Sequence, residues 1–361
     1  GGSDAASSRY IHTELNKLTQ FIYPKEDFPL LQYIEDDGLS VEPDYYVPIL
    51  PMVLVNGMTG IGTGFSTNIP CFNPKDICQN IRNILDEKPF TEMQPWFKGF
   101  NGSITKTGEK TYLCKGSYKV LDAKTIEITE LPVGRWTEDY KEILNKLVIE
   151  RGSKDSKGII VDYENQSTDH SVYFKVYLKP GYLSTAQWSD SEIDKIEKDF
   201  KLTTTKQTSL TNIHLYNEDN TITRYHDIET IMRDYSKVRL ELYKKRKDYQ
   251  LQELDKQIHL LTAKCRFILD VVEERIVIYR QTKDKIKEQL VSKEYPLINE
   301  SFDYLLKLPI YSLTKEEIDK LLQEKGDLES QHSELFNKTT QDIWLSELST
   351  FEKEYSKFLK K

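Results

Sequence analysis

One stretch of the sequence, from Ile228 to Leu290, contains neither proline nor glycine, and this stretch most restricts what the chain can fold into. Apolar or nearly apolar residues recur along it at alternating intervals of three and four, which is the spacing of a heptad seam. The seam residues are Leu251, Leu254, Ile258, Leu261, Cys265, Ile268 and Val272. We expect one continuous helix of roughly 60 residues, about 90 Å long, and a second helix that covers its apolar stripe.

The residues that follow can supply that second helix. Thr314 and Glu317 have the spacing of a capping box, and Leu321, Leu328 and Leu335 lie one heptad apart. The apolar pattern continues to the end of the chain at Trp344, Leu348, Phe351, Tyr355 and Phe358. We expect an antiparallel coiled coil with a small knob at about 291–313. Residues 302–309 would give this knob an exposed apolar surface, which suits a dimer contact.

The chain before residue 228 alternates between helical and strand patterns. Apolar spacing predicts helices at 10–22, 73–87 and 137–150, and a capping box of Ser189 and Glu192 predicts another short helix. Alternating residues predict β-hairpins over 99–131 and two strands within 158–179. Residues 45–55 are apolar but contain two prolines, which predicts a buried, irregular segment. The fold class is therefore α+β.

Composition restricts the class of protein. Hydrophobic residues make up 38% and charged residues 30% of the 361 residues, which suits globular domains joined to solvated helices. No apolar run predicts a membrane span, and the N-terminus shows neither a secretory signal nor a starting Met, which indicates an excised segment. The four cysteines form no CxxC pair and are expected to be reduced thiols. With a net charge of −8, any DNA contact needs a local basic groove.

Arg9 and Tyr10 form the first pair that could carry chemistry. A tyrosine at the start of a helix is most often an ordinary surface or core residue. The functional alternative is a nucleophile, for which a phenol with a pKa near ~10 needs its anion stabilised. An adjacent guanidinium and a divalent metal ion could provide this. A tyrosyl phosphodiester would conserve the energy of a broken DNA backbone bond, so that resealing needs no ATP.

Residues 57–64 contain four glycines in eight positions. They do not form a Walker A loop, because no Gly-Lys-Ser/Thr ends them, and Pro51 argues against a dinucleotide fingerprint. The segment is either a tight connector or a loop pressed against nucleic acid, with Ile61 as an apolar wedge between base pairs. The basic run 244–247 is likewise either a solvated helix face or a DNA contact.

Taken together, ordered segments of the sequence resemble the eukaryotic-type type IIA DNA topoisomerases. Residues 4–10, DAASSRY, are similar to the active-site tyrosine motif of that family, and residues 48–57 followed by 60–64 are similar to its most recognisable signature. The other similar segments, in order, are 127–132 with Trp136 and Thr137, 207–210, Arg239 with 245–247, 304–306, 313–316 and 342–344. The resemblance covers essentially the whole chain.

The resemblance implies roles for individual residues. Tyr10 would be the nucleophile that forms a 5′-phosphotyrosine link, and Arg9 would stabilise the transition state at the scissile phosphate. Ile61, between Gly60 and Gly62, would intercalate and bend the DNA. The flanking DNA would be touched by Trp136, Lys206, Gln207, Thr208, Ser209, Leu210, Thr211 and Asn212. No metal ligand is expected in this chain.

The resemblance also implies an architecture and partners. Residues 1–70 would hold the end of a winged-helix domain and the DNA-bending loop, 71–225 a mixed α/β shoulder or tower domain, and 226–361 the coiled coil and C-terminal gate. The enzyme would make a transient double-strand break, pass a second duplex and reseal the first with the help of ATP. Double-stranded DNA and a second copy of the chain, bound through the gate, would be the partners, with no membrane.

Cofactors and location follow from the same resemblance. Mg²⁺ would be bound by a Toprim domain and ATP by an ATPase domain, both upstream, so the chain alone should be inactive or nearly so. The protein would work inside cells, in the nucleus if cellular, or in host cytoplasm or virion if viral. A short connection at 291–301 is compatible with a large-DNA-virus version. Departures from the family pattern are Ser8, Met58-Thr59, Phe65 and Gly134-Arg135, which concern loop geometry.

Two alternatives stand beside this interpretation. The first is a non-catalytic coiled-coil protein that dimerises and binds DNA or chromatin; it fits the long helix and the acidic balance but leaves Arg9, Tyr10 and the glycines unexplained. The second is a bacterial-type gyrase subunit, which is disfavoured because the corresponding domain of that family forms a different C-terminal assembly.

Overall fold

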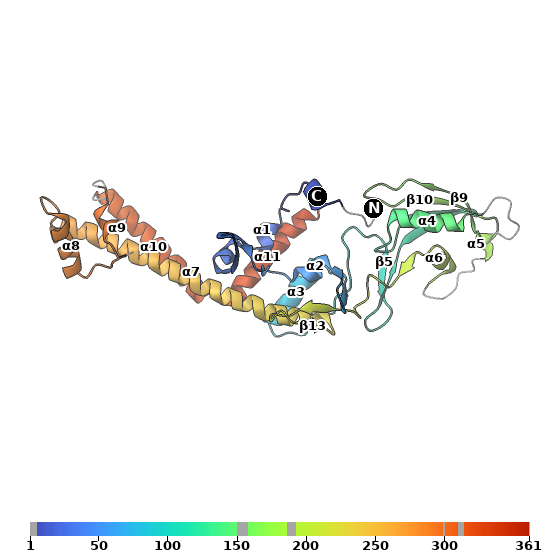
Figure 1. Ribbon diagram of the computed structural model, residues 1–361, viewed down its shortest axis with the longest axis horizontal. Helices are drawn as coiled ribbons and strands as arrows, with labels where there is room; N and C mark the ends of the chain where they lie inside the picture. The colour runs from blue at the N-terminus through green and yellow to red at the C-terminus, as the bar shows by residue number, and fades with distance from the viewer. Residues whose placement is uncertain (1–5, 150–157, 186–192, 299, 310–313, 361) are drawn as a thin grey trace. The chain divides into compact units, whose positions relative to one another are not determined.

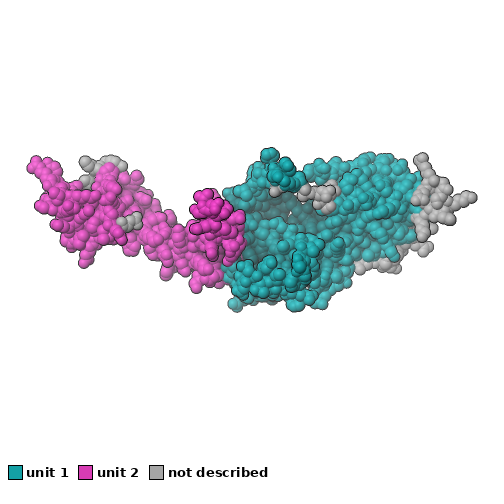
Figure 2. Space-filling view, viewed as in Figure 1, with its two compact units in different colours: residues 1–24, 47–239, 348–361 teal, residues 25–46, 240–347 magenta. Residues whose placement is uncertain are grey.

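A computed structural model describes residues 6–149, 158–185, 193–298, 300–309 and 314–360 of the chain. It has a mixed α+β fold made of two compact units (Figure 2). Unit 1 comprises residues 1–24, 47–239 and 348–361, and unit 2 comprises 25–46 and 240–347. The expected helix starting at the Ser189 and Glu192 box lies outside the described residues, which contain instead a capping box of Asp194 and Glu197.

The largest sheet of unit 1 is antiparallel, with strand order β7-β8-β10-β9 (Figure 1). Its strands are β7 Ser117–Asp122, β8 Thr125–Glu130, β9 Ile160–Asn165 and β10 Phe174–Leu178. Three helices accompany it: α4 Thr137–Leu147, α5 Tyr182–Thr185 and α6 Lys195–Asp199. The strands and α4 lie where alternation and helical spacing predict them.

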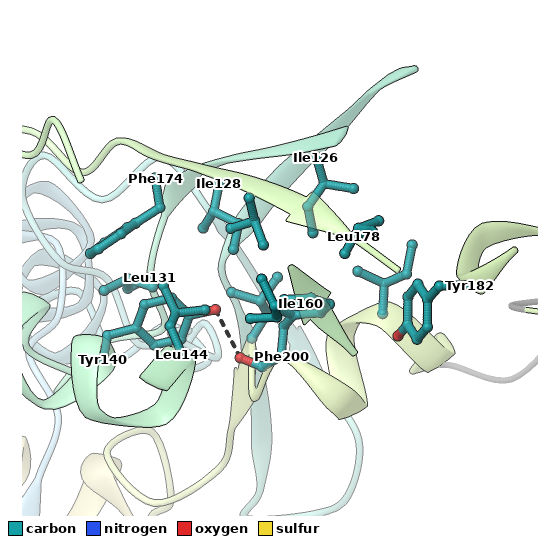
Figure 3. Packing of buried hydrophobic residues seen from close by; sticks show 13 residues of the cluster. Ile126, Ile128, Leu131, Tyr140, Leu144, Ile160, Phe174, Leu178, Tyr182 and Phe200 are labelled. Atoms are coloured by element: carbon teal, nitrogen blue, oxygen red, sulfur yellow. Dashed lines mark hydrogen bonds between the residues drawn. The ribbon is translucent and has the colours of Figure 1, made fainter. Parts of the chain in front are cut away.

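One apolar core joins this sheet to its helices (Figure 3). Phe174 of β10 and Tyr140 of α4 are fully buried and pack edge to face, with ring centroids 5.3 Å apart. The Tyr140 hydroxyl donates to the Phe200 carbonyl at 2.9 Å, so the polar end of this buried ring is satisfied. Burial raises the pKa of the Tyr140 hydroxyl far above its ordinary value.

Three smaller sheets complete the strands of unit 1. The pairs are β3 Met58–Ile61 with β4 Ser66–Ile69, and β12 His214–Tyr216 with β13 Ile222–Arg224. The third sheet has the order β11-β6-β5 and consists of β5 Ser103–Lys106, β6 Tyr112–Lys115 and β11 Thr203–Thr204. The glycine-rich segment is therefore one arm and the turn of a hairpin.

The apolar segment 45–55, predicted to be buried and irregular, is buried over 48–51 and at Leu54, whereas Tyr45 and Tyr46 are 63% and 50% exposed. Ile49 and Leu50 are fully buried, and the segment ends in the short helix α2 Met52–Asn56. It is followed by α3 Pro74–Leu85, whose N-cap Asn73 accepts a hydrogen bond from the Lys75 N–H. Arg82 of α3 forms a bidentate ion pair with Glu352.

The helix expected at 10–22 forms only in part. Residues Ser8–Tyr10 make a single 3₁₀ turn (η1), and α1 covers only Thr19–Ile22. Ile11 and Leu15 are 46% and 84% exposed, so the apolar face that was to stabilise the helix is not covered. Without a buried face, a short helix has little to stabilise it in water.

In unit 2, helix α7 Ile228–Val272 continues from unit 1 and runs antiparallel to α10 Lys315–Asn337 (Figure 1). Lys247 donates to the carbonyls of Phe336 and Lys338, and further along α7 the Asp255 carboxylate lies 3.2 Å from His332. The heptad residues of α7 are buried or half-buried except Val272, which is 54% exposed. The predicted pairing of two helices is confirmed. The second helix of the pair, α10, ends at Asn337, and after a break at Lys338 the chain continues as α11 Thr340–Phe358.

The long helix ends at Val272 and not near Leu290 as expected. Glu274 takes a left-handed conformation (φ 57°), and the Ile276 N–H donates to the Asp270 carbonyl at 2.9 Å. Ile276 thereby folds back into an apolar cluster with Phe267 and Leu290, where it is 1% exposed. The free energy gained by burying the Ile276 side chain is larger than the small helical propensity that would extend α7 past Val272. A separate helix, α8 Lys283–Ser292, follows.

The apolar residues of 302–309 do not form the surface that was expected of them. Phe302 and Leu305, at the start and in the middle of α9 Asp303–Leu306, are 5% and 1% exposed and belong to the cluster of Phe267. A small domain has too few apolar residues to leave these out of its core.

The Thr314 capping box is also absent, since Thr314 is the N-cap of α10 but its side chain makes no capping hydrogen bond.

A buried ion network holds residues 25–46 within unit 2. The Arg246 guanidinium, 8% exposed, contacts Glu347 at 2.6 Å and Asp27 at 3.4 Å. Arg246 is therefore neither the solvated residue nor the DNA contact that its basic run suggested. Residues 25–46 also contain the 3₁₀ helix η2 Lys25–Leu30 and a hairpin of β1 Tyr33–Asp36 and β2 Leu39–Pro43.

Replacing Phe174 by Ala should lower the free energy of unfolding by about 3–5 kcal/mol, because it removes a fully buried ring and leaves a cavity. Urea unfolding followed by near-UV circular dichroism measures the loss. Leu121→Ala in β7 is the control, since Leu121 is 49% exposed and should change stability by about 0.5 kcal/mol or less. Equal losses in the two variants would contradict the proposed core.

Candidate functional site

Tyr10 presents an accessible phenol. It is 75% exposed, and its backbone N–H donates to the Ser7 carbonyl at 2.9 Å, which closes the turn η1. The guanidinium carbon of Arg9 lies 5.4 Å from the centre of the Tyr10 ring. A cation next to an accessible hydroxyl is what a phenolic nucleophile needs when it approaches a phosphate. The sequence-predicted pair therefore stands together and is open to a large substrate.

Several other tyrosines of unit 1 are poorly placed for such a role. Burial and the neighbouring Glu92 carboxylate raise the pKa of Tyr112 to about 12. Burial, with the hydrogen bond that each donates to an aspartate, also raises the pKa of Tyr118 and Tyr182. A raised pKa makes the phenolate, the attacking form, rarer.

The tip of the β3–β4 hairpin carries Ile61, which is 92% exposed. Just beyond it, the Gly62 N–H donates to the Phe65 carbonyl at 2.8 Å, and Gly64 has a φ of +84° that closes the turn. A branched apolar side chain held out in solvent on a narrow hairpin has the shape of a wedge. The hairpin thus combines both interpretations of the glycine segment, a tight connector and an exposed apolar tip.

The predicted DNA-contact segment packs beside this hairpin. The Asn68 N–H donates to the Asn212 carbonyl at 2.8 Å, and the Asn68 side chain donates to the Lys206 carbonyl at 3.1 Å. The Asn212 side chain in turn donates to the Ser66 hydroxyl at 2.9 Å. Residues separated by more than a hundred positions are thereby brought to one place.

Individual residues of this segment are placed differently. Lys206 and Thr211 are exposed, and Gln207, Ser209, Leu210 and Asn212 are half-buried. Thr208 is fully buried, and its hydroxyl donates to the Tyr112 carbonyl at 2.6 Å. The Thr208 side chain therefore holds the segment to β6 and has no exposed atom to offer a ligand.

Trp136 joins the same surface through Gly134. Trp136 is 42% exposed and is the N-cap residue of α4. Gly134 has a φ of +81°, and a Cβ built there would lie 2.5 Å from the Gln207 side chain. Another residue at position 134 would be strained by this backbone conformation and would have to displace the Gln207 side chain. The departure from the family pattern at Gly134 thus coincides with a contact between the Trp136 loop and the predicted DNA-contact segment.

A cleft of about 350 Å³ opens beside Trp136. Its wall is formed by residues 98–101, 129–137 and 168–172. Arg135 lies in this wall, and its buried Nε has no hydrogen-bond partner among the described residues. His170 is another wall residue. In the sequence, Arg135 was noted only as a departure from the family pattern and His170 was not singled out, because three separate segments build the cleft and no spacing pattern links them.

Among the described residues, no group of three or more His, Cys, Asp or Glu side chains could hold a metal ion. Tyr10 and Arg9 therefore have no metal site formed by these residues beside them. The described part of the chain also contains no helix with the length and apolar character needed to cross a membrane.

A family model for the A subunit of DNA gyrase/topoisomerase IV matches residues 1–349. The chain belongs to this family of type II DNA topoisomerases. The match includes Arg9, Tyr10, Ile61 and the segment from Lys206 to Asn212.

Similar members of the topoisomerase family carry the name DNA topoisomerase 2. The chain is 34% identical to that of Penicillium chrysogenum and 35% identical to that of Arabidopsis thaliana, over 98% and 99% of its own length. It is also 34% identical to the enzyme of Acanthamoeba polyphaga mimivirus. The chain spans 24%, 26% and 33% of these three proteins. Topoisomerases of cells and of a virus are thus about equally similar to it.

A solved structure supports the family at the level of the fold. The DNA-binding, cleavage and re-ligation domain of Plasmodium falciparum topoisomerase II superposes with a TM-score of 0.84 at 33% identity. The superposition covers 99% of this chain and 51% of that one. The α+β fold is therefore that of a topoisomerase II cleavage core.

Replacing Gly57 by Ala should destabilise the β3–β4 hairpin by at least about 1–2 kcal/mol, because Gly57 has a φ of +67°. A Cβ there would also lie 2.8 Å from the Ile69 carbonyl oxygen. Amide hydrogen exchange of residues 58–69 measures the effect. Gly60→Ala is the matched control, since its Cβ would meet nothing nearer than Thr67 Cγ2 at 3.7 Å. Faster exchange in the Gly60 variant than in the Gly57 variant would refute this account.

Proposed function

We propose that this chain supplies the DNA-cleaving tyrosine, the DNA-bending hairpin and the dimer gate of an ATP-dependent type II DNA topoisomerase. The single observation that carries the proposal is the exposed Tyr10 phenol with Arg9 beside it, in a chain that belongs to the topoisomerase family. Membership in that family favours catalysis over a purely structural coiled-coil protein.

In the proposed reaction, the Tyr10 hydroxyl oxygen attacks the phosphorus of a DNA phosphodiester. A bond forms between this oxygen and phosphorus, and the bond from phosphorus to the 3′ oxygen breaks. Tyr10 loses its proton, the departing 3′ oxygen gains one, and a 5′-phosphotyrosine remains. Attack by the 3′ hydroxyl reverses each step, so the strand is resealed without external energy. Arg9 would neutralise charge on the non-bridging phosphate oxygens.

Mg²⁺ and ATP belong to the proposed activity, as the family resemblance implies. A bound Mg²⁺ would stabilise negative charge on the phosphate and on the departing oxygen. By the same resemblance, a Toprim domain and not this chain would bind the metal ion. ATP would be bound by a separate ATPase domain. Tyr10 and Arg9 act here only on the phosphate.

Double-stranded DNA is the proposed substrate, and three features of unit 1 favour it. The exposed Ile61 would enter the stack of bases, and Gly60 and Gly62 would leave room for the DNA backbone. The segment from Lys206 to Asn212 and the Trp136 loop lie on the flank of the hairpin. Because the protein has a net charge of −8, DNA contact is confined to such local surfaces.

We also propose the domain division that the resemblance implies. Residues 1–70 contain the tyrosine region and bending loop, 71–225 the tower, and 226–361 the coiled coil and C-terminal gate, with a knob at about 291–313. The gate would join two copies of the chain. Support comes from apolar side chains near the knob that stay exposed: Val277, Ile278, Tyr279, Val291 and Leu297. Such a protein would work where DNA is handled, in a nucleus or, if viral, in host cytoplasm or virion.

Replacing Tyr10 by Phe in the full-length protein should abolish covalent attachment to DNA, a loss of about 1,000-fold or more, because the attacking oxygen is gone. Denaturant quenching followed by detection of protein-linked DNA measures attachment. Tyr216→Phe is the control, since Tyr216 is 68% exposed but lies in β12. An adduct that survives in the Tyr10 variant would sink the proposal and favour a different nucleophile.

Replacing Arg9 by Ala should slow attachment about 100- to 1,000-fold, because one preorganised cation at the phosphate is lost. DNA binding should change far less, since Arg9 makes only one of many contacts. Rapid-quench cleavage assays and fluorescence anisotropy measure the two quantities. Arg224→Ala is a suitable control, as Arg224 is an exposed arginine on β13. Equal loss of binding and cleavage would show that Arg9 only helps to hold DNA.

A further inference from the structure

The β3–β4 hairpin is attached to the segment 206–214 by side chains on both sides. Asn68 contributes two bonds across this junction: its backbone N–H donates to the Asn212 carbonyl at 2.8 Å, and its side-chain Nδ2 donates to the Lys206 carbonyl at 3.1 Å. The Asn68 side-chain oxygen accepts a hydrogen bond from Thr59 of the other arm of the hairpin at 3.1 Å. Asn68 therefore ties both arms of the hairpin to the neighbouring segment.

His214 makes a second attachment. Its Nδ1 lies 2.9 Å from the Ser66 carbonyl oxygen and 3.1 Å from the Asn212 side-chain oxygen. Both partners can only accept, so Nδ1 must carry the proton and donate. The His214 backbone N–H donates to the Thr67 hydroxyl at 3.2 Å, and its ring packs against the edge of Phe65.

An isolated two-stranded hairpin is marginally stable in water and would bend easily. When an apolar side chain separates stacked bases, the protein segment that carries it must not deform at a lower free-energy cost than the unstacking itself. Ile61 is 92% exposed, so its own packing cannot resist that deformation. The resistance has to come from the contacts between β4 and the segment 206–214, where the bonds of Asn68 and His214 lie.

We infer that Asn68 and His214 are positioning residues for DNA bending. They hold the hairpin in a fixed direction, so that insertion of Ile61 deforms the duplex and not the protein. This inference rests on the proposed function and deepens it, since it names the residues that make the wedge stiff. Neither residue needs to touch DNA for this role.

A double-mutant cycle in the full-length protein tests the inference. The variants are Asn68→Ala, Ile61→Ala and the two combined, and the readout is the bent fraction of a duplex labelled with donor and acceptor dyes. Asn68→Ala should lower the ratio of bent to unbent DNA about three- to tenfold through the loss of its side-chain bonds. Affinity for DNA should change less than about twofold. In the Ile61→Ala background, Asn68→Ala should not lower the bent fraction further, because Asn68 affects bending only through Ile61.

Thr59→Val is the matched control, because it removes a bond inside the hairpin and leaves both bonds to the 206–214 segment in place. It should bend DNA nearly as wild type does. His214→Phe, which keeps a ring against Phe65 but loses the donor, should resemble Asn68→Ala. Thermal unfolding of each variant verifies that it folds.

Three results would overturn the inference: unchanged bending in Asn68→Ala, additive effects of Asn68 and Ile61, or a loss of affinity as large as the loss of bending. Attachment through Tyr10, measured on the same wild-type preparation, separates this failure from failure of the proposed function. Adduct formation without a role for Asn68 refutes only the positioning role. Absence of the adduct, or one that persists in Tyr10→Phe, refutes the proposed function itself.

Discussion

Hydrogen bonds between two distant parts of the chain, Ser66–Ile69 and the segment 206–214, assemble the candidate DNA surface. Ile69 and Ile213 are buried, and hydrogen bonds set the contact between the two parts. The hairpin relies on the segment for its direction, and the segment is held in turn by Thr208, whose buried hydroxyl bonds to β6. The hairpin is thus connected to β6 through a short series of polar contacts, each worth about 1 kcal/mol.

Two arginines of the chain, Arg246 and Arg9, differ in their burial. Arg246, in the most basic run of the long helix, forms buried ion pairs with Asp27 and Glu347. An unpaired charge at this place would be strongly destabilising. Arg9, by contrast, stays exposed beside Tyr10. A basic residue is therefore informative about DNA only once its burial is known, which explains how an acidic chain can belong to a DNA-binding family.

Periodicity predicted most of the regular structure, because the core around the β7-β8-β10-β9 sheet and the seam of α7 obey simple spacing rules. It failed where burial of one side chain decided the outcome. Ile276 ends α7 early by entering the cluster of Phe267, and no local pattern records that contact. The exposed Ile11 and Leu15 left the expected first helix unsupported. Motifs located Tyr10 and Ile61, but the cleft beside Trp136 and the bonds of Asn68 arise from tertiary contacts that spacing does not encode.

His214, which fastens the hairpin, is also the first residue of β12, and β13 ends only a few residues before α7 begins at Ile228. The helix α7 has 45 residues. Such a helix is about 67 Å long, so a tilt of about 5° at Ile228 would carry Val272 through about 6 Å. A small rotation at the start of α7 is therefore multiplied along the length of the helix into a displacement as wide as a side chain at its other end.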